Sequence, residues 1–293
     1  MMWMLFALLS ATLLGFYDVF KKRSLGGNAV IPVLFLNTLF CSLIFVPLLP
    51  SIPFGGWHEQ RYVVLKSLIV LSSWAFGYVG IKNLPLTLVG PINATRPVMV
   101  LLGALLVFGE RLNVYQWIGV VFAVVSFFLL SRSGKKEGID FRHNKWVVCV
   151  VLAALLGAVS GLYDKFLMAP VESGGVGMNR MMVQSYYNFY QCLIMGIVLL
   201  TVWLPKRRSS TPFRWDWCIP LISIFLSAAD FVYFYALSLD DALVSVVSMV
   251  RRSSVIVSFL VGAFLFRERN LASKAFDLAM VLIGMVFLFI GSL

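Results

Sequence analysis

Residues 86–113 read LTLVGPINATRPVMVLLGALLVFGERLN, an apolar run of membrane-spanning length with Arg96 at its middle. Residues 244–271 repeat the pattern as VSVVSMVRRSSVIVSFLVGAFLFRERNL, with Arg251 and Arg252 at mid-run. A guanidinium near the centre of a bilayer-spanning helix costs about 3 kcal/mol on insertion scales. Because two spans carry that cost, the sequence indicates a specific role for the central arginines.

The composition surrounding these runs is that of a membrane protein. The chain has 293 residues, of which 60% are hydrophobic and 13% charged, and its mean hydropathy is +0.92. A soluble domain of this length cannot bury so much apolar surface, so we expect a polytopic membrane protein. The net charge of +11 lies in short loops between apolar runs, which is typical of membrane proteins and argues against a nucleic-acid partner. The four cysteines lie in or beside apolar runs, so we expect packing residues, with no metal site and no cofactor.

Ten segments reach the length of about 20 mainly apolar residues that a membrane helix needs. We therefore expect an all-α integral membrane fold of ten transmembrane helices. The predicted spans are 3–20, 29–49, 63–81, 86–107, 114–131, 146–168, 181–204, 217–237, 242–266 and 272–290.

The longest hydrophilic stretch, residues 132–145, separates five spans from five. Short motifs recur in the same order on either side: GFYD at 15–18 and GLYD at 161–164, Asn37 and Cys41 with Asn188 and Cys192, and LP at 49–50 and 204–205. We therefore expect two repeats, residues 1–131 and 146–293, joined by a basic central loop. An odd number of spans in each repeat makes the second copy enter the membrane from the opposite side, as in inverted-repeat transporters.

The motif that closes each repeat points to a known family. Residues 103–119 read GALLVFGERLNVYQWIG, and the second copy keeps the Glu268-Arg269 pair that answers Glu110-Arg111. The whole chain resembles the EamA-type branch of the drug/metabolite transporter superfamily. The resemblance implies a helical transporter of a small metabolite, in which spans one to four and six to nine line the path and spans five and ten brace it.

The charge pattern predicts an orientation. Sixteen Lys and Arg residues fall in the odd-numbered loops and five in the even-numbered ones, which places the odd loops in the cytoplasm and both termini outside. The family resemblance implies termini inside, so the two expectations differ. We follow the charge pattern and expect a multi-pass protein of the cytoplasmic (inner) membrane, monomeric or homodimeric.

The central arginines are the first candidates for solute recognition. Arg96 lies between Pro91 and Pro97, so we expect residues 90–97 to interrupt the helix and open its carbonyls. Asn93 lies one turn earlier on the same face. In the second half, Ser248 and Arg252 share a face, whereas Arg251 points about 100° away. On this interpretation Arg96 and Arg252 form a pseudo-symmetric cationic pair that recognises an anionic or carboxylate-bearing solute.

An alternative interpretation makes these arginines structural, neutralised by the aspartates within the spans. Arg251 is our candidate for that role. Asp230 lies deep in span eight and is a candidate for proton coupling or for pairing with an arginine. Asp18 and Asp164 lie near the ends of equivalent spans and are candidates for gates or proton exchange. Alternatively, Asp18 belongs to a solvated interface with nearby lysines and Asp164 pairs with its neighbour, Lys165.

Further polar and aromatic side chains within spans are candidates for lining the path. Span seven has an unusual polar density, and polar groups inside a membrane normally face the bundle interior or a wet cavity. Trp74 and Tyr78 share a face of span three and could stack on a planar ligand or simply pack. The candidate substrate-binding residues are Arg96, Asn93, Arg252, Ser248, Tyr186, Tyr190, Asn188, Asn37, Trp74 and Tyr78. The Glu-Arg pairs Glu110-Arg111 and Glu268-Arg269 are expected to be structural.

These features predict a secondary active transporter for a small polar metabolite, anionic or zwitterionic, such as an amino acid or nucleobase-like solute. The chain has no GxxxxGK[ST] nucleotide loop, so we expect the driving force to come from a gradient or from exchange. The aspartates within the spans make protons the candidate coupling ion. A flippase for a lipid-linked intermediate is the alternative within transport. An integral-membrane enzyme is disfavoured because the only two histidines, His58 and His143, lie in loops on opposite sides of the membrane.

Overall fold

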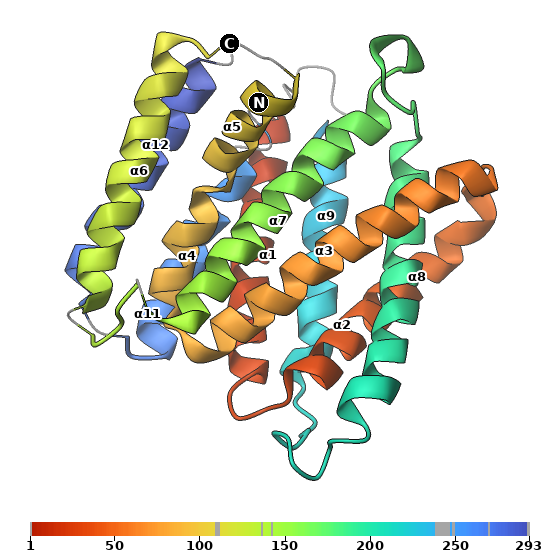
Figure 1. Cartoon of the computed structure of the whole chain (residues 1–293), viewed down its shortest axis with the longest axis horizontal. Coiled ribbons are helices and arrows are strands. Elements are labelled where there is room, and N and C mark those ends of the chain that lie inside the picture. The colour runs from red at the N-terminus through yellow and green to blue at the C-terminus, as the bar shows by residue number, and fades with distance from the viewer. Residues whose placement is uncertain are drawn as a thin grey trace.

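The computed structural model describes residues 2–108, 112–135, 137–141, 143–237, 247, 250–268 and 270–291. Within these ranges all regular structure is helical, as predicted (Figure 1). The helices are α1 (Met2–Ser24), α2 (Val30–Phe45), α3 (Trp57–Asn83), α4 (Leu86–Ala94), α5 (Arg96–Phe108), α6 (Val114–Lys135), α7 (Lys145–Met168), α8 (Arg180–Val198), α9 (Cys218–Leu237), α11 (Ser254–Leu265) and α12 (Leu271–Ile290). Short turns η1 (Val46–Ser51), η2 (Val171–Ser173) and η3 (Leu199–Trp203) extend or link them.

Seven helical segments are long and apolar enough to cross a membrane. They are α1, α3, the first 18 residues of the α4–α5 pair, α6, α7, α8 with η3, and α12. α2 and the first part of α9 are shorter apolar helices. α11 covers the second half of the predicted span 242–266, whereas residues 242–246 lie outside the described part of the chain. Each of these helices overlaps a segment predicted as a span, and α1, α3 and α6 extend several residues beyond the predicted ends.

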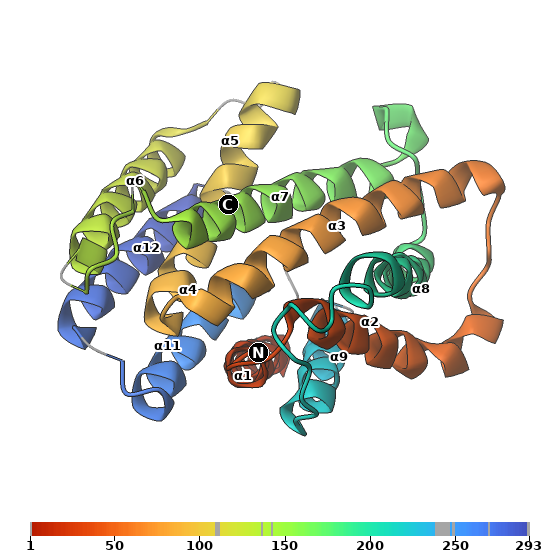
Figure 2. The same ribbon diagram turned by 60° about the horizontal axis from the view of Figure 1, so that its bottom comes forward.

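The helices of the two halves pack in matching pairs (Figure 2). α1 packs along α9, and α3 packs along α7. α2 packs on α8, α4 on α11, and α6 on α12. When each span is replaced by its counterpart in the other half, the α1–α9 pair becomes the α3–α7 pair. The pairs α2–α8, α4–α11 and α6–α12 each join a span to its own counterpart, so they stay the same. This is the pattern of contacts that a two-fold relationship between the halves produces.

Small residues allow the closest of these contacts. A Cβ atom on Gly119 of α6 would lie 2.7 Å from the carbonyl oxygen of Gly284 on α12. The hydroxyl of Ser126 on α6 also donates to the carbonyl oxygen of Asp277 at 2.7 Å. Because no hydrophobic effect drives helices together within lipid, close backbone packing and such hydrogen bonds hold the pair.

The loops are segregated between two ends of the bundle. Figure 1 shows both termini at one end, which we call the terminal end. The loops α1–α2, α3–α4, α6–α7, α8–α9 and α11–α12 lie at the opposite end, which we call the basic end. The basic end therefore carries the loops that are rich in Lys and Arg. The uneven distribution of charge along the sequence thus places most basic loop residues at one end of the bundle.

The helix around Arg96 is interrupted more narrowly than predicted. α4 ends at Ala94, Thr95 alone lies outside a helix, and α5 begins with Arg96. The Thr95 hydroxyl donates to the carbonyl of Ile92 at 2.7 Å, which satisfies one freed acceptor. Pro97 lies in the first turn of α5, where an N–H has no partner within the helix, so this proline does not disturb the ladder.

Glu268 holds the start of α4 in place. Its carboxylate accepts hydrogen bonds from the backbone N–H groups of Leu86 at 2.6 Å and Thr87 at 2.9 Å, and from the Thr87 hydroxyl. An acidic group at a helix N-terminus satisfies free donors and complements the helix dipole. The buried Lys274 extends this network by donating to Thr87 Oγ1 at 3.0 Å and to the carboxylate of Glu137 at 2.7 Å.

Candidate functional site

A cavity of about 170 Å³ lies between the two halves, on the basic-end side of the break at Thr95. Side chains from α1, α3, α4, α5, α7, α9 and the segment leading into α11 line it. Four of these side chains carry charge: Asp18, Lys21, Arg96 and Arg252. Among the described residues, α6 and α12 contribute nothing to its wall, and neither do α2 and α8, which the resemblance expected to line the path.

Arg96 lines this cavity at the start of α5. Its Nε atom is buried and has no hydrogen-bond partner among the described residues. The guanidinium lies against Gly157 of α7, where a Cβ atom would approach its Cζ and Nη1 atoms to 3.0 Å. The glycine therefore leaves the space in which the guanidinium lies.

Arg252 lines the same cavity from the opposite half of the chain. In the described part of the chain, neither guanidinium is within 4.0 Å of a carboxylate oxygen. Two like charges held together out of bulk water are costly without a counter-ion. The pair is therefore suited to bind an anion.

The carboxylate of the cavity is Asp18, which pairs with Lys21 at 2.6 Å. The Lys21 ammonium also lies 4.1 Å from the centroid of the Tyr17 ring and 5.4 Å from that of Tyr78. The sequence placed Lys21 in a loop and offered a solvated interface for Asp18. That expectation is wrong, since Lys21 is only 7% exposed and both residues face inward, because α1 continues to Ser24.

Uncharged groups complete the wall. Asn93 lines the cavity one turn before Arg96, and its Oδ1 atom is buried without a partner among the described residues. Trp74 and Tyr78 face the cavity from α3, so the shared face predicted for them points inward. The structure thus brings together Asn93, Arg96, Arg252, Trp74, Tyr78 and Asp18, all singled out from the sequence.

Arg251 and Asp230 form a separate ion pair outside this cavity. The Arg251 guanidinium lies 4.4 Å from the centroid of the Tyr233 ring, which adds a cation–π contact. The pairing matches the expectation that the two adjacent arginines point in different directions. It also gives Asp230 a partner, as one of the two interpretations proposed.

Asp164 pairs with Lys66 of α3, near the terminal end. Lys66 also donates to the Ser160 hydroxyl at 2.8 Å and is 4% exposed. The sequence counted Lys66 with the loop charges, whereas the structure places it inside α3 and buries it. Lys165, the partner that the sequence suggested for Asp164, has a side chain that lies outside the described part of the chain.

The polar candidates of span seven and Asn37 do not line this cavity. Tyr190 donates to Gln60 Oε1 at 2.9 Å, and Tyr186 packs on the ring of Phe54. Asn188 donates to the Gln184 carbonyl at 3.0 Å. Asn37 accepts a hydrogen bond from the Ser223 hydroxyl at 2.9 Å. Tyr190 and Asn37 thus bond between helices, which is the other use of polar side chains in a membrane, whereas Asn188 bonds within α8.

Some of the residues singled out from the sequence lie outside the part of the chain that the structure describes. Ser248, Glu110, Arg111 and Arg269 are among the residues for which no structure is described. Glu268 is described, and its hydrogen bonds to α4 agree with a structural role.

Sequence reasoning missed Tyr17, Lys21, Ser73 and Gly157 at the cavity and Lys66 at the terminal end. A usable signal existed for Lys21, which follows Asp18 at the helical spacing of three residues. No local pattern marks Gly157, because its role depends on a side chain from another helix.

Comparison with known proteins identifies the family. The family model of EamA-like transporters matches the chain at residues 1–132 and again at 144–290. The chain belongs to the EamA-like transporter family. It is therefore a multi-pass membrane transporter of small solutes, as the resemblance implied.

The fold of this EamA-like transporter also recurs in solved structures. A crystal structure of another protein aligns with 98% of this chain and 94% of its own, with a TM-score of 0.56 and 15% sequence identity. At that identity the likeness concerns the fold alone. A search of curated proteins finds no match to the sequence.

Proposed function

We propose that this EamA-like protein is a secondary active transporter that moves a small anionic or zwitterionic metabolite across the cytoplasmic membrane by alternating access. The observation that carries the proposal is the cavity in which Arg96 and Arg252 lie together without a described carboxylate partner. A bound anionic group would accept hydrogen bonds from both guanidinium groups, which favours solutes with a carboxylate.

The remainder of the wall supports a solute of mixed character. Asp18 supplies one negative charge, and the rings of Trp74 and Tyr78 supply faces that attract a cation or stack on a planar group. The unpartnered Asn93 Oδ1 atom accepts a hydrogen bond. An amino acid or a nucleobase-like solute fits this set of groups. A volume of about 170 Å³ favours a compact molecule.

Two inverted five-helix repeats supply a route for alternating access. The matching helix pairs support this arrangement, with residues 132–145 as the connection between the repeats. Asp18 with Lys21 and Asp164 with Lys66 then lie at corresponding places toward opposite ends. We assign them to two gates, in which the aspartates exchange protons as each gate opens, so that protons drive transport.

The basic end faces the cytoplasm in this proposal, and both termini lie outside. Lysine and arginine in short loops favour the cytoplasmic side. Removing the buried Lys21, Lys66 and Lys274 from the loop count leaves the bias toward the basic end unchanged in direction. The transporter acts as a monomer or a homodimer.

Uptake into proteoliposomes tests the proposal. Wild-type protein would be supplied with labelled amino acids, nucleobases and carboxylates, and each uptake would be competed with unlabelled anions, zwitterions and cationic dyes. Competition by anions or zwitterions is the expected outcome. A preference for cations would contradict the proposal that the arginines bind the solute. Movement of a fluorescent lipid between leaflets without any solute uptake would favour the flippase.

A further inference from the structure

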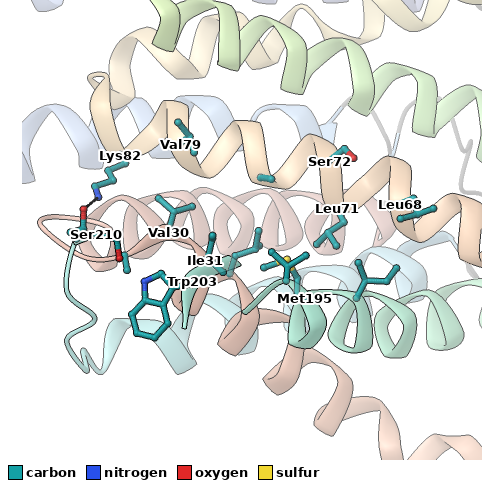
Figure 3. Close-up of a pocket in the computed structure, with 16 residues that line it drawn as sticks. Val30, Ile31, Leu68, Leu71, Ser72, Val79, Lys82, Met195, Trp203 and Ser210 are labelled. Carbon is teal, nitrogen blue, oxygen red and sulfur yellow. Dashed lines mark hydrogen bonds between the residues drawn. The ribbon is translucent and has the colours of Figure 1, made fainter. Parts of the chain in front are cut away.

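A second, larger cavity lies on the outer side of α3. It is a groove of about 570 Å³ between α2, α3 and α8 (Figure 3). The two cavities are lined by different residues of α3, which lies between them. Trp74 and Tyr78 face the central cavity, whereas Leu71, Ala75 and Val79 face the groove. The groove therefore forms no part of the proposed solute site.

The walls of the groove are apolar for most of its length. They include Leu34, Leu68, Leu71, Ala75, Ile194 and Met195. The residues of α3 that line it run from Leu68 to Lys82, which corresponds to about 21 Å of helix at 1.5 Å per residue. One leaflet of hydrocarbon is about 15 Å thick, half of the bilayer core. The groove is thus long enough to hold one acyl chain.

The end of the groove at the basic end is polar. Lys82 and Trp203 lie there with the hydroxyls of Ser210 and Thr211 (Figure 3). The Lys82 ammonium donates to the carbonyl oxygen of Asn28 at 2.7 Å and lies 3.5 Å from Thr211 Oγ1. The indole Nε1 atom of Trp203 is buried with no partner among the described residues. A cation and a free N–H donor therefore meet where the apolar walls end.

The charge at this mouth is mainly positive. Lys206, Arg207 and Arg208 are exposed on the adjoining loop, and the first acidic residue after them is Asp216. None of the residues that line the groove is acidic. In a juxtamembrane cluster of basic residues, each Lys or Arg strengthens the affinity for anionic lipid headgroups about fivefold.

We propose that the groove binds an anionic phospholipid, with one acyl chain along α3 and the phosphate at Lys82 and Trp203. The phosphate accepts hydrogen bonds from the Trp203 N–H, the Lys82 ammonium and the two hydroxyls. The basic loop at 206–208 supplies the preference for a net negative headgroup.

Native mass spectrometry of the purified full chain tests this site. Phosphatidylglycerol and phosphatidylcholine with identical acyl chains would be titrated separately, and glycerol phosphate would supply the headgroup without chains. We expect phosphatidylglycerol to bind about fivefold or more tightly than phosphatidylcholine, and glycerol phosphate not to be retained. Equal retention of the two lipids, or retention of glycerol phosphate alone, would overturn the proposal.

Two kinds of variant locate the lipid. Ser72→Trp, which adds an indole to the groove, should reduce retention of both lipids, whereas Val124→Trp at a lipid-exposed position of α6 should not. Trp203→Phe keeps an aromatic side chain and removes the N–H donor, so it should weaken the binding of both lipids about tenfold, because both carry the phosphate that accepts from it. Lys82→Gln should lower phosphatidylglycerol binding about fivefold. Unchanged lipid binding in Ser72→Trp and Trp203→Phe would place the lipid elsewhere.

Discussion

Gly157 of α7 lies directly against the guanidinium of Arg96, and a Cβ atom at residue 157 would be 3.0 Å from Arg96 Cζ. That distance is shorter than an ordinary carbon contact, so any larger residue must displace the guanidinium. The position of the proposed anion-binding group is therefore set by a glycine on a neighbouring helix.

Gly157→Ala should raise the solute concentration for half-maximal uptake about tenfold, because small displacements of a positioning group are costly. Gly161→Ala is the matched control on the same helix, since its Cβ would meet Val100 at an ordinary 3.7 Å. Uptake kinetics and the midpoint of thermal unfolding would be measured for both. An equal effect of the two substitutions would show that space beside Arg96 is not what matters.

Arg251 and Arg252 are adjacent but should behave differently. Arg251→Gln leaves Asp230 unpaired inside the bundle and should lower the free energy of unfolding by about 3 kcal/mol. The double variant Arg251→Gln/Asp230→Asn should recover most of that loss. Arg252→Gln should not destabilise the protein, because it removes a cation that has no described partner. Denaturant unfolding in detergent measures all three, and a loss of stability in Arg252→Gln would contradict this assignment.

Glu268 should contribute to stability without entering solute recognition. Glu268→Ala leaves the first N–H groups of α4 without their acceptor and should cost about 1–2 kcal/mol in the free energy of unfolding. Glu172→Ala in the exposed η2 turn is the comparison. The affinity for the solute should remain unchanged in folded Glu268→Ala protein. A large change in solute specificity would assign this carboxylate to transport instead.

The two proposed gates make opposite predictions for accessibility. Asp164→Asn weakens the contact with Lys66 toward the terminal end and should increase the labelling of a Ser73→Cys reporter by a membrane-impermeant thiol reagent added from that side. Asp18→Asn should increase labelling from the basic end. The reporter would be introduced into a chain whose four native cysteines are replaced by serine. Equal labelling from both sides in both variants would rule out separate gates.

The sequence predicted much of the site because charge is conspicuous inside apolar runs. Arg96, Arg252 and Asp18 stand out against their neighbours, and Asn93 shares a face with Arg96 at helical spacing. Their convergence follows from the pairing of helices between the halves, which the motif repeats indicated. The helical fold itself followed from span-length apolar segments.

What the sequence could not supply depends on helix ends and on neighbours from distant helices. Lys21 was assigned to a loop because its span was predicted to end at residue 20, whereas α1 continues to Ser24. Lys66 and Lys274 were counted with the loop charges because they lie close to the starts of the predicted spans 63–81 and 272–290, and the structure buries both. The polar groups of span seven were expected to line the path, yet they do not line the central cavity. Tyr190 donates to Gln60 of α3 at 2.9 Å, and the Asn188 side chain bonds within its own helix.

The most direct test of the arginine site is solute uptake by Arg96→Gln, Arg252→Gln and the exposed-loop control Arg207→Gln in the same proteoliposomes. We predict that uptake of the anionic or zwitterionic solute falls about a hundredfold in the first two variants, through loss of charge-assisted hydrogen bonds, and is unchanged in the control. Wild-type uptake of that solute by both Arg96→Gln and Arg252→Gln would contradict the account.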